Sequence, residues 1–139
     1  MQTFLPYSDF IESMKVLDSK RLGKQRVEAY QILNVLLNRP RKDGKPYKGW
    51  VNHPCVRMWK GYEDALKVYI NVCIDEWKDR GFKNTMEYER PTTDDVIFPN
   101  WLGDERIHSS HRSNLLRKDE TFYSRFGWRE TNDIEYFWV

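Results

Sequence analysis

The sequence has few cysteines and no long apolar run. Two cysteines, Cys55 and Cys73, occur among 139 residues, which is too few for a fold built on disulfides. No apolar stretch approaches the roughly 20 residues of a membrane-spanning helix. The first residues, MQTFLPYSDF, lack the basic start and apolar stretch of a secretory signal peptide. We therefore expect a cytoplasmic protein with two reduced, buried thiols and no membrane partner.

Motifs of several enzyme classes are also missing. The sequence contains no G-x-S-x-G and no glycine-rich phosphate loop, which argues against a serine hydrolase and a nucleotide-loop enzyme. The H-x-x-H pair of His108 and His111 leaves only His53 as a third histidine. Catalytic zinc sites use three protein ligands, and no compelling acidic partner stands near this pair. We expect neither a metal nor another cofactor.

The composition that is present fits one folded domain. The length suits a single domain over residues 1–139. Hydrophobic residues make up 40% of the chain and aromatic residues 15%, whereas disordered chains are poor in both.

The net charge of +2 hides a basic stretch. Residues 15–48 hold ten Lys or Arg and three acidic residues, so this stretch alone is +7. Such a local excess favours a polyanion, such as a nucleic acid, as partner of one face. A solvated basic surface is the alternative.

Apolar spacing and capping residues predict a helical protein. Ser8 or Asp9 is expected to cap a helix through Leu17, and Asp18 to cap a second that reaches about Asn38. Residues 39–50 contain two Pro and two Gly, which predicts a loop. Pro54 fits the first turn of a helix of roughly 25 residues that ends at Gly81.

Less regular structure is expected in the last third. Residues 82–103 contain prolines and a glycine and are predicted to be irregular. Helices are expected over about 105–117 and 120–125, and the aromatic tail 128–139 is expected to pack on the core. The predicted fold is all-α, a single compact domain of three main helices plus short helices and long loops.

One face of the second predicted helix collects charged and polar residues. Arg21, Lys24, Gln25 and Glu28 are spaced by three, four and seven residues, which places them together on a helix. Arg26 projects from the side. Arginine and lysine can hold phosphates while one carboxylate acts on the sugar or base between them. Ordinary salt bridging between helix neighbours is the simpler interpretation of this spacing alone.

A second polar cluster lies in the sequence ERIHSSHRSNLLRKD. We interpret His111, Arg112, Ser113 and Asn114 as phosphate contacts, with capping of the helix by the serines as the alternative.

Three stretches resemble the phage pyrimidine-dimer DNA glycosylases, the class called endonuclease V. They are LDSKRLGKQRVE, which ends at Glu28, KDRGF at 78–82 and ETFYSRFG at 120–127. The likeness covers most of the chain in the same order. The sequence is closer still to small uncharacterised bacterial and phage proteins that begin M-[QN]-T-F-L-P and contain RLGKQRVE, NHP and HxSHRSNLLRKD.

The resemblance implies a function. In that family the N-terminal amine attacks C1′ of a nucleotide that the enzyme has flipped from the duplex, a Schiff base forms, and β-elimination cuts the strand. It implies Met1 as nucleophile, Glu28 as acid or base, double-stranded DNA as partner, and no cofactor. DNA or phosphate contacts are then expected from Arg21, Lys24, Gln25, Arg26, Arg41, Lys42, His111, Arg112 and Arg117.

The sequence departs from the family in three places. Residue 2 is Gln, which disfavours removal of Met1, so the amine of Met1 itself would be the nucleophile. The spacing from Asp18 to Glu28 is one residue longer than in the family, which places Val27 where the family has Arg. The loop 38–50 is an insertion. The alternatives are a non-catalytic nucleic-acid-binding module and a nucleotide-binding protein. A monomer is expected.

Overall fold

The computed structural model describes residues 1–46 and 50–139, and its regular structure is helical. The helices are α1 (Phe10–Val16), α2 (Ser19–Leu36), α3 (Pro54–Trp59), α4 (Glu63–Asp79), α5 (Glu105–Lys118) and α6 (Glu120–Tyr123), followed by a 3-10 turn, η1 (Ser124–Phe126). No strand occurs among the described residues, so the all-α prediction is confirmed. The part of the predicted loop at 47–49 lies outside the described residues.

The ends of the first two helices follow the predicted capping. The carboxylate of Asp9 accepts a hydrogen bond from the backbone N–H of Glu12 at 2.8 Å, and Asp18 accepts one from the N–H of Arg21 at 3.4 Å. Both aspartates satisfy amide groups that a helix N-terminus leaves unpaired. The described residues of the predicted loop, 39–46 and 50, lie outside any helix.

The prediction of one long helix after Pro54 is wrong. The chain leaves the helical path after Trp59, and Gly61 adopts φ of 88°, a left-handed conformation that glycine tolerates best. A new helix, α4, then begins at Glu63 with two acidic residues in its first turn. Acidic residues favour a helix N-terminus. The apolar spacing continues across the break, which is why periodicity alone did not reveal it.

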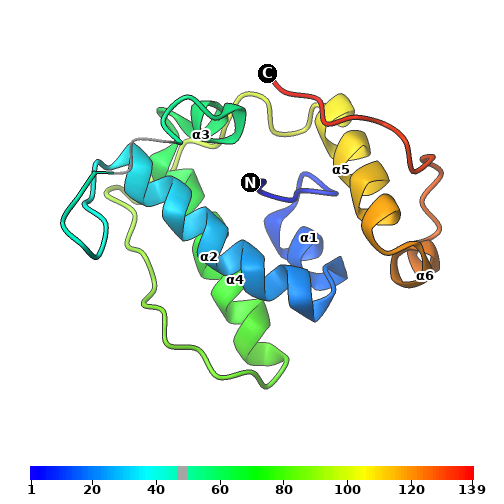
Figure 1. The fold of residues 1–139 in the computed structure, drawn as a ribbon, viewed down its shortest axis with the longest axis horizontal. Helices are drawn as coiled ribbons and strands as arrows, with labels where there is room; N and C mark the ends of the chain where they lie inside the picture. Colours follow the sequence, from blue (N-terminus) through cyan, green and yellow to red (C-terminus); the bar gives the residue numbers. More distant parts are fainter. Residues whose placement is uncertain (47–49) are drawn as a thin grey trace.

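Helices α2 and α4 pack along each other, and α1 packs against α4 (Figure 1). Their apolar side chains form the core, in which Leu22, Leu33 and Ile70 have no exposed surface. Gly23 lies where α2 meets Trp77, because a Cβ at this position would lie 3.0 Å from two carbons of the indole ring. The contact therefore explains a glycine inside a helix, where it is otherwise unfavourable.

The C-terminal tail packs on this core, as expected from its aromatic residues. Trp128, Tyr136 and Trp138 are partly buried against the core. Cys55 and Cys73 are both buried and free, and burial raises the pKa of Cys55 to about 11. No helix in the described ranges is long and apolar enough to cross a membrane.

The N-terminal segment, residues 1–6, lies in the middle of the molecule. Figure 1 shows it between α2 on one side and α5 on the other. It contains no helix or strand, yet residues 2–5 are buried.

Candidate active site

Side chains supply the hydrogen bonds that the N-terminal segment lacks from its own backbone. Buried amide and carbonyl groups must be paired, and this segment has no regular structure to pair them. From α2, the Gln25 amide accepts from Phe4 N–H at 2.8 Å and donates to the carbonyl of Gln2 at 2.6 Å. From α4, the hydroxyl of Tyr69 donates to the carbonyl of Phe4 at 2.9 Å. The segment is thus fixed to the α2–α4 side.

Two histidines of α5 fix the other side of the same segment. The N–H of Leu5 donates to Nδ1 of His111 at 2.9 Å. The Nδ1 of His108 lies 2.8 Å from the Leu5 carbonyl, while its Nε2 accepts from Gly103 N–H at 2.9 Å. These partners fit neutral rings. Burial is the main cause that lowers the pKa of His111 to about 3, and the positive charge of Arg112 acts in the same direction.

The second polar cluster contacts the chain's own backbone, whereas the sequence analysis interpreted its residues as phosphate contacts. His111 is 1% exposed, so its ring cannot reach a phosphate in this conformation. Arg112 donates to the carbonyl of Pro6 at 2.6 Å and is paired with Glu130 at 2.9 Å. Ser113 and Asn114 bond backbone groups of the C-terminal tail. This sequence binds two segments of the chain's own backbone.

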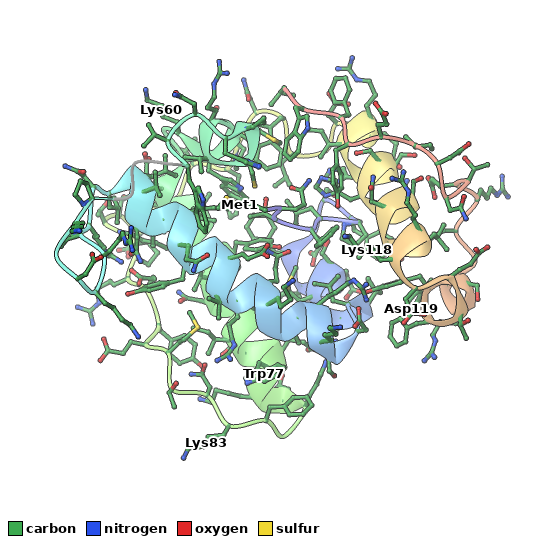
Figure 2. The ribbon with its side chains drawn as sticks, viewed as in Figure 1. Met1, Lys60, Trp77, Lys83, Lys118 and Asp119 are labelled. Atoms are coloured by element: carbon green, nitrogen blue, oxygen red, sulfur yellow. The ribbon has the colours of Figure 1, made fainter. Side chains whose placement is uncertain are left out.

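The first residue of the chain lies at the wall of a pocket of about 330 Å³. One carboxylate, Glu28, and four cationic side chains line it; the cations are Lys20, Arg21, Lys24 and Lys118. The remaining wall consists of Met1, Gln2, Phe4, Gln25 and Tyr136. Figure 2 shows Met1 in the middle of the molecule and Lys118 toward the C-terminal end of α5. The pocket thus combines an α-amine, a carboxylate and an excess of positive charge.

The amine end of the chain lies close to Glu28. The backbone N–H of Gln2, one residue from the terminal amine, lies 3.4 Å from Oε2 of Glu28. Burial, and after it the positive charge of the N-terminal amine, lowers the pKa of His53. His53 does not itself line the pocket.

Arg21 is held at the pocket through Asp18. The guanidinium of Arg21 lies 3.2 Å from the Asp18 carboxylate, and the hydroxyl of Tyr123 also donates to that carboxylate. Burial by itself raises the pKa of Asp18, but the hydrogen bonds from Tyr123 and Arg21 outweigh it and lower the pKa. The aromatic C-terminal region is in this way joined to the base of α2.

The structure brings five of the predicted site residues together at this pocket: Met1, Arg21, Lys24, Gln25 and Glu28. The other six predicted residues do not line it. His111 and Arg112 bond the chain's own backbone, as described above, and the remaining four lie elsewhere. Arg26 lies over the ring of Trp77, 4.7 Å from its centroid. Arg41 pairs with Asp43 in the loop, Lys42 is exposed in that loop, and Arg117 donates to two carbonyls of the C-terminal tail.

Five pocket residues were missed by the sequence analysis: Phe4, an apolar residue of the N-terminal segment, and four polar residues. Lys20 had a usable signal, since it lies four residues before Lys24 and next to Arg21 on the same helix. Lys118 and Tyr136 come from segments far away in sequence, and Gln2 was considered only for its effect on removal of Met1. No group of three or more His, Cys, Asp or Glu side chains in the described ranges is placed to hold a metal ion.

A family model described as pyrimidine dimer DNA glycosylase matches residues 1–90. The matched range contains the N-terminal segment, α1 to α4 and every pocket residue except Lys118 and Tyr136. No curated protein and no solved structure matches the chain.

Proposed function

The chain belongs to the pyrimidine dimer DNA glycosylase family, and we propose that it is a DNA glycosylase with abasic-site lyase activity whose nucleophile is the α-amine of Met1. At the level of the family, the function is glycosylase-type repair and the substrate is DNA. The proposal adds the nucleophile, the acid or base and the strand cleavage, as well as a double-stranded substrate whose damaged nucleotide is flipped out.

One observation supports the proposal above the others. Met1 and Glu28 line the same pocket, although 26 residues separate Glu28 from Gln2, whose N–H lies 3.4 Å from its carboxylate. An α-amino group ordinarily titrates near 7.7–8.0, against about 10.4 for lysine. A larger fraction of it is therefore neutral and nucleophilic at neutral pH, so a chain terminus is a suitable amine for imine chemistry.

The chemistry needs only groups that the chain supplies. The amine lone pair attacks C1′ as the glycosidic bond breaks, and the base leaves with the bonding electrons and a proton. Opening of the sugar ring and loss of the amine proton give an imine between the Met1 nitrogen and C1′. Removal of a proton from C2′ then expels the 3′ phosphate by β-elimination, and water releases the amine. Glu28 is the proposed proton donor and acceptor for these steps.

The cations around the pocket are the proposed phosphate contacts. Lys20, Arg21, Lys24 and Lys118 surround it, and Arg41, Lys42 and Arg117 are proposed as further contacts to the DNA backbone outside the pocket. Gln25 and His111 are left out of this set, because both ends of the Gln25 amide are bonded to the N-terminal segment and His111 does not line the pocket. Flipping of a nucleotide out of the duplex exposes its C1′ to the amine, because the stacked bases otherwise shield that atom.

Borohydride trapping tests the proposal directly. The untagged protein is incubated with a duplex that contains one abasic site, borohydride is added, and a covalent adduct is sought on a denaturing gel. Mass spectrometry of the intact protein determines whether Met1 is retained, and peptide mapping locates the adduct. We expect the adduct on the amine of Met1, and much less of it with Glu28→Gln or after acetylation of the terminus.

The alternatives make different predictions in the same assay. A non-catalytic binding module gives salt-sensitive DNA binding without an adduct. A nucleotide-binding protein gives saturable binding of a mononucleotide and no affinity for duplex DNA. Either result contradicts the proposed function.

A further inference from the structure

Gln2 has one polar group without a partner in the described part of the chain. The residue is 4% exposed and lines the pocket. Its N–H points to Glu28, its carbonyl accepts from Gln25, and its side-chain oxygen accepts from Thr3 N–H at 2.9 Å. The side-chain nitrogen, Nε2, is buried and makes no hydrogen bond. Buried donors in proteins are nearly always paired, so an unpaired one at a pocket wall needs an explanation.

The orientation of this amide follows from its neighbours. Oxygen and nitrogen of a glutamine side chain are assigned from their hydrogen bonds. The atom that faces Thr3 must accept, because a backbone N–H can only donate, and the thiol of Cys55 lies 3.8 Å from the same atom. Exchanging the two atoms would place an NH₂ group against the N–H of Thr3. The orientation is thus fixed, and the unpaired group is the NH₂ donor.

We propose that Gln2 is a substrate-binding residue whose Nε2–H donates to an oxygen of the nucleotide attacked at C1′. This inference rests on the proposed function. Two oxygens of such a nucleotide lie near C1′. One is the ring oxygen of the sugar, which is bonded to C1′, and the other is the carbonyl oxygen at C2 of a pyrimidine. Both are acceptors that become more electron-rich during the reaction, the first when the ring opens and the second when the base leaves. A donor fixed beside Met1 stabilises that change.

Two variants isolate the donor. Gln2→Glu keeps an acceptor for Thr3 N–H and adds a negative charge, whereas Gln2→Met adds no charge and loses that acceptor. The only change that they share is loss of the Nε2–H donor. Circular dichroism melting confirms that each variant is folded at the assay temperature, and intact mass confirms that Met1 is retained. If only one variant is folded, its rate decides.

The rates are measured with saturating protein in single turnovers on two duplexes. One contains an abasic site, and the other contains one thymine dimer. We expect both variants to be slower than the wild type by about tenfold to a hundredfold, the usual effect of losing one buried hydrogen bond to a substrate. If both duplexes react slowly, the acceptor is the sugar oxygen. If only release of the base is slow, the acceptor is the base carbonyl.

A folded variant that reacts with both duplexes at the wild-type rate overturns the inference and leaves the proposed function intact. Absence of a trapped adduct with the wild-type protein is a different result, because it removes the proposed function and this inference with it.

Discussion

Two regions of the molecule are built in opposite ways. On the apolar side, α2 and α4 meet each other through residues such as Leu22, Leu33 and Ile74, which have no exposed surface. On the polar side, the N-terminal segment is held by hydrogen bonds, from Gln25 and Tyr69 of α2 and α4 and from His108 and His111 of α5. Apolar burial is non-directional and stabilises many similar arrangements, whereas a hydrogen bond requires a short distance and a narrow angle. The polar side is therefore the one that can fix the position of an amine.

Helix α5 extends this principle to the other end of the chain. Ser110 accepts from Phe137 N–H at 3.1 Å, and Asn114 donates to the carbonyl of Ile134 at 2.9 Å. The side chains of this helix thus hold both termini through hydrogen bonds to their backbone groups. We expect substitutions in the apolar core to change stability most, and substitutions in the polar contacts to change chemistry more than stability.

The largest effect on stability is expected from Leu33→Ala in α2. Removal of a fully buried leucine side chain costs about 2–5 kcal/mol, because burial energy is lost and a cavity remains. Urea unfolding followed by circular dichroism measures the change. The exposed Ile11, at 54%, provides the control, since Ile11→Ala is expected to change stability by about 0.5 kcal/mol or less. Equal losses for the two variants would contradict the assignment of the core.

The polar side is expected to make stability depend on pH through His111. Burial lowers its pKa to about 3 in the folded protein, against an ordinary value of 6.5. Between these values the unfolded chain binds a proton that the folded chain excludes, so stability is lost as pH falls below about 6.5. The slope is at most about 1.4 kcal/mol per pH unit.

Urea unfolding at pH 7, 6 and 5 tests this for the wild type and for His111→Asn, which offers an acceptor to Leu5 N–H without titrating. We expect a shallower pH dependence in the variant. Parallel curves would show that His111 does not exclude a proton in the folded protein.

Substitution of Gln25 is expected to lower the free energy of unfolding and, separately, the rate of trapping by the folded protein. Gln25→Leu removes the bonds to Phe4 N–H and to the Gln2 carbonyl, which costs about 1–3 kcal/mol because buried groups lose their partners. The Met1 amine then loses its fixed position, so the rate of borohydride trapping is expected to fall even at temperatures where the variant is fully folded. Gln25→Glu is the matched variant, since it keeps an acceptor for Phe4 N–H, loses the donor to the Gln2 carbonyl and adds a negative charge. If a folded Gln25→Leu protein is trapped at the wild-type rate, Gln25 does not position the Met1 amine.

The smallest effect is expected from Gly23→Ala on the apolar side. Alanine favours the helix by about 1 kcal/mol over glycine, but its Cβ would lie 3.0 Å from the ring of Trp77, and overpacking costs a similar amount or more. We expect a net change within about 1 kcal/mol and unchanged trapping. A large loss of trapping would mean that the apolar contact also positions the amine.

Local patterns in the sequence predicted most of the helices. Asp9 and Asp18 cap helices because an aspartate satisfies the amide groups of the first turn, and Gly81 and Gly127 follow helix ends with positive φ. The exception is the break at Gly61. It was missed because apolar residues continue at helical spacing on both sides of it, and because Glu63 and Asp64 were not read as the first turn of a new helix.

Part of the site followed from the same local reasoning. Arg21, Lys24, Gln25 and Glu28 meet because a helix brings residues three, four and seven apart to one face. The direction of each side chain did not follow. Gln25 belongs to the same row as the cations, yet its amide is bonded to residues 2 and 4.

The sequence by itself therefore determined most of the helices and their caps, the basic face of α2 and, through its motifs, the family. Only the tertiary structure decided that Met1 lies beside Glu28, that Lys118 and Tyr136 complete the pocket, and that His111 faces inward. The physical reason is the separation along the chain of the residues that interact. Caps and helix faces depend on residues a few positions apart, whereas the pocket joins the first residue of the chain to α2, α5 and the C-terminal tail.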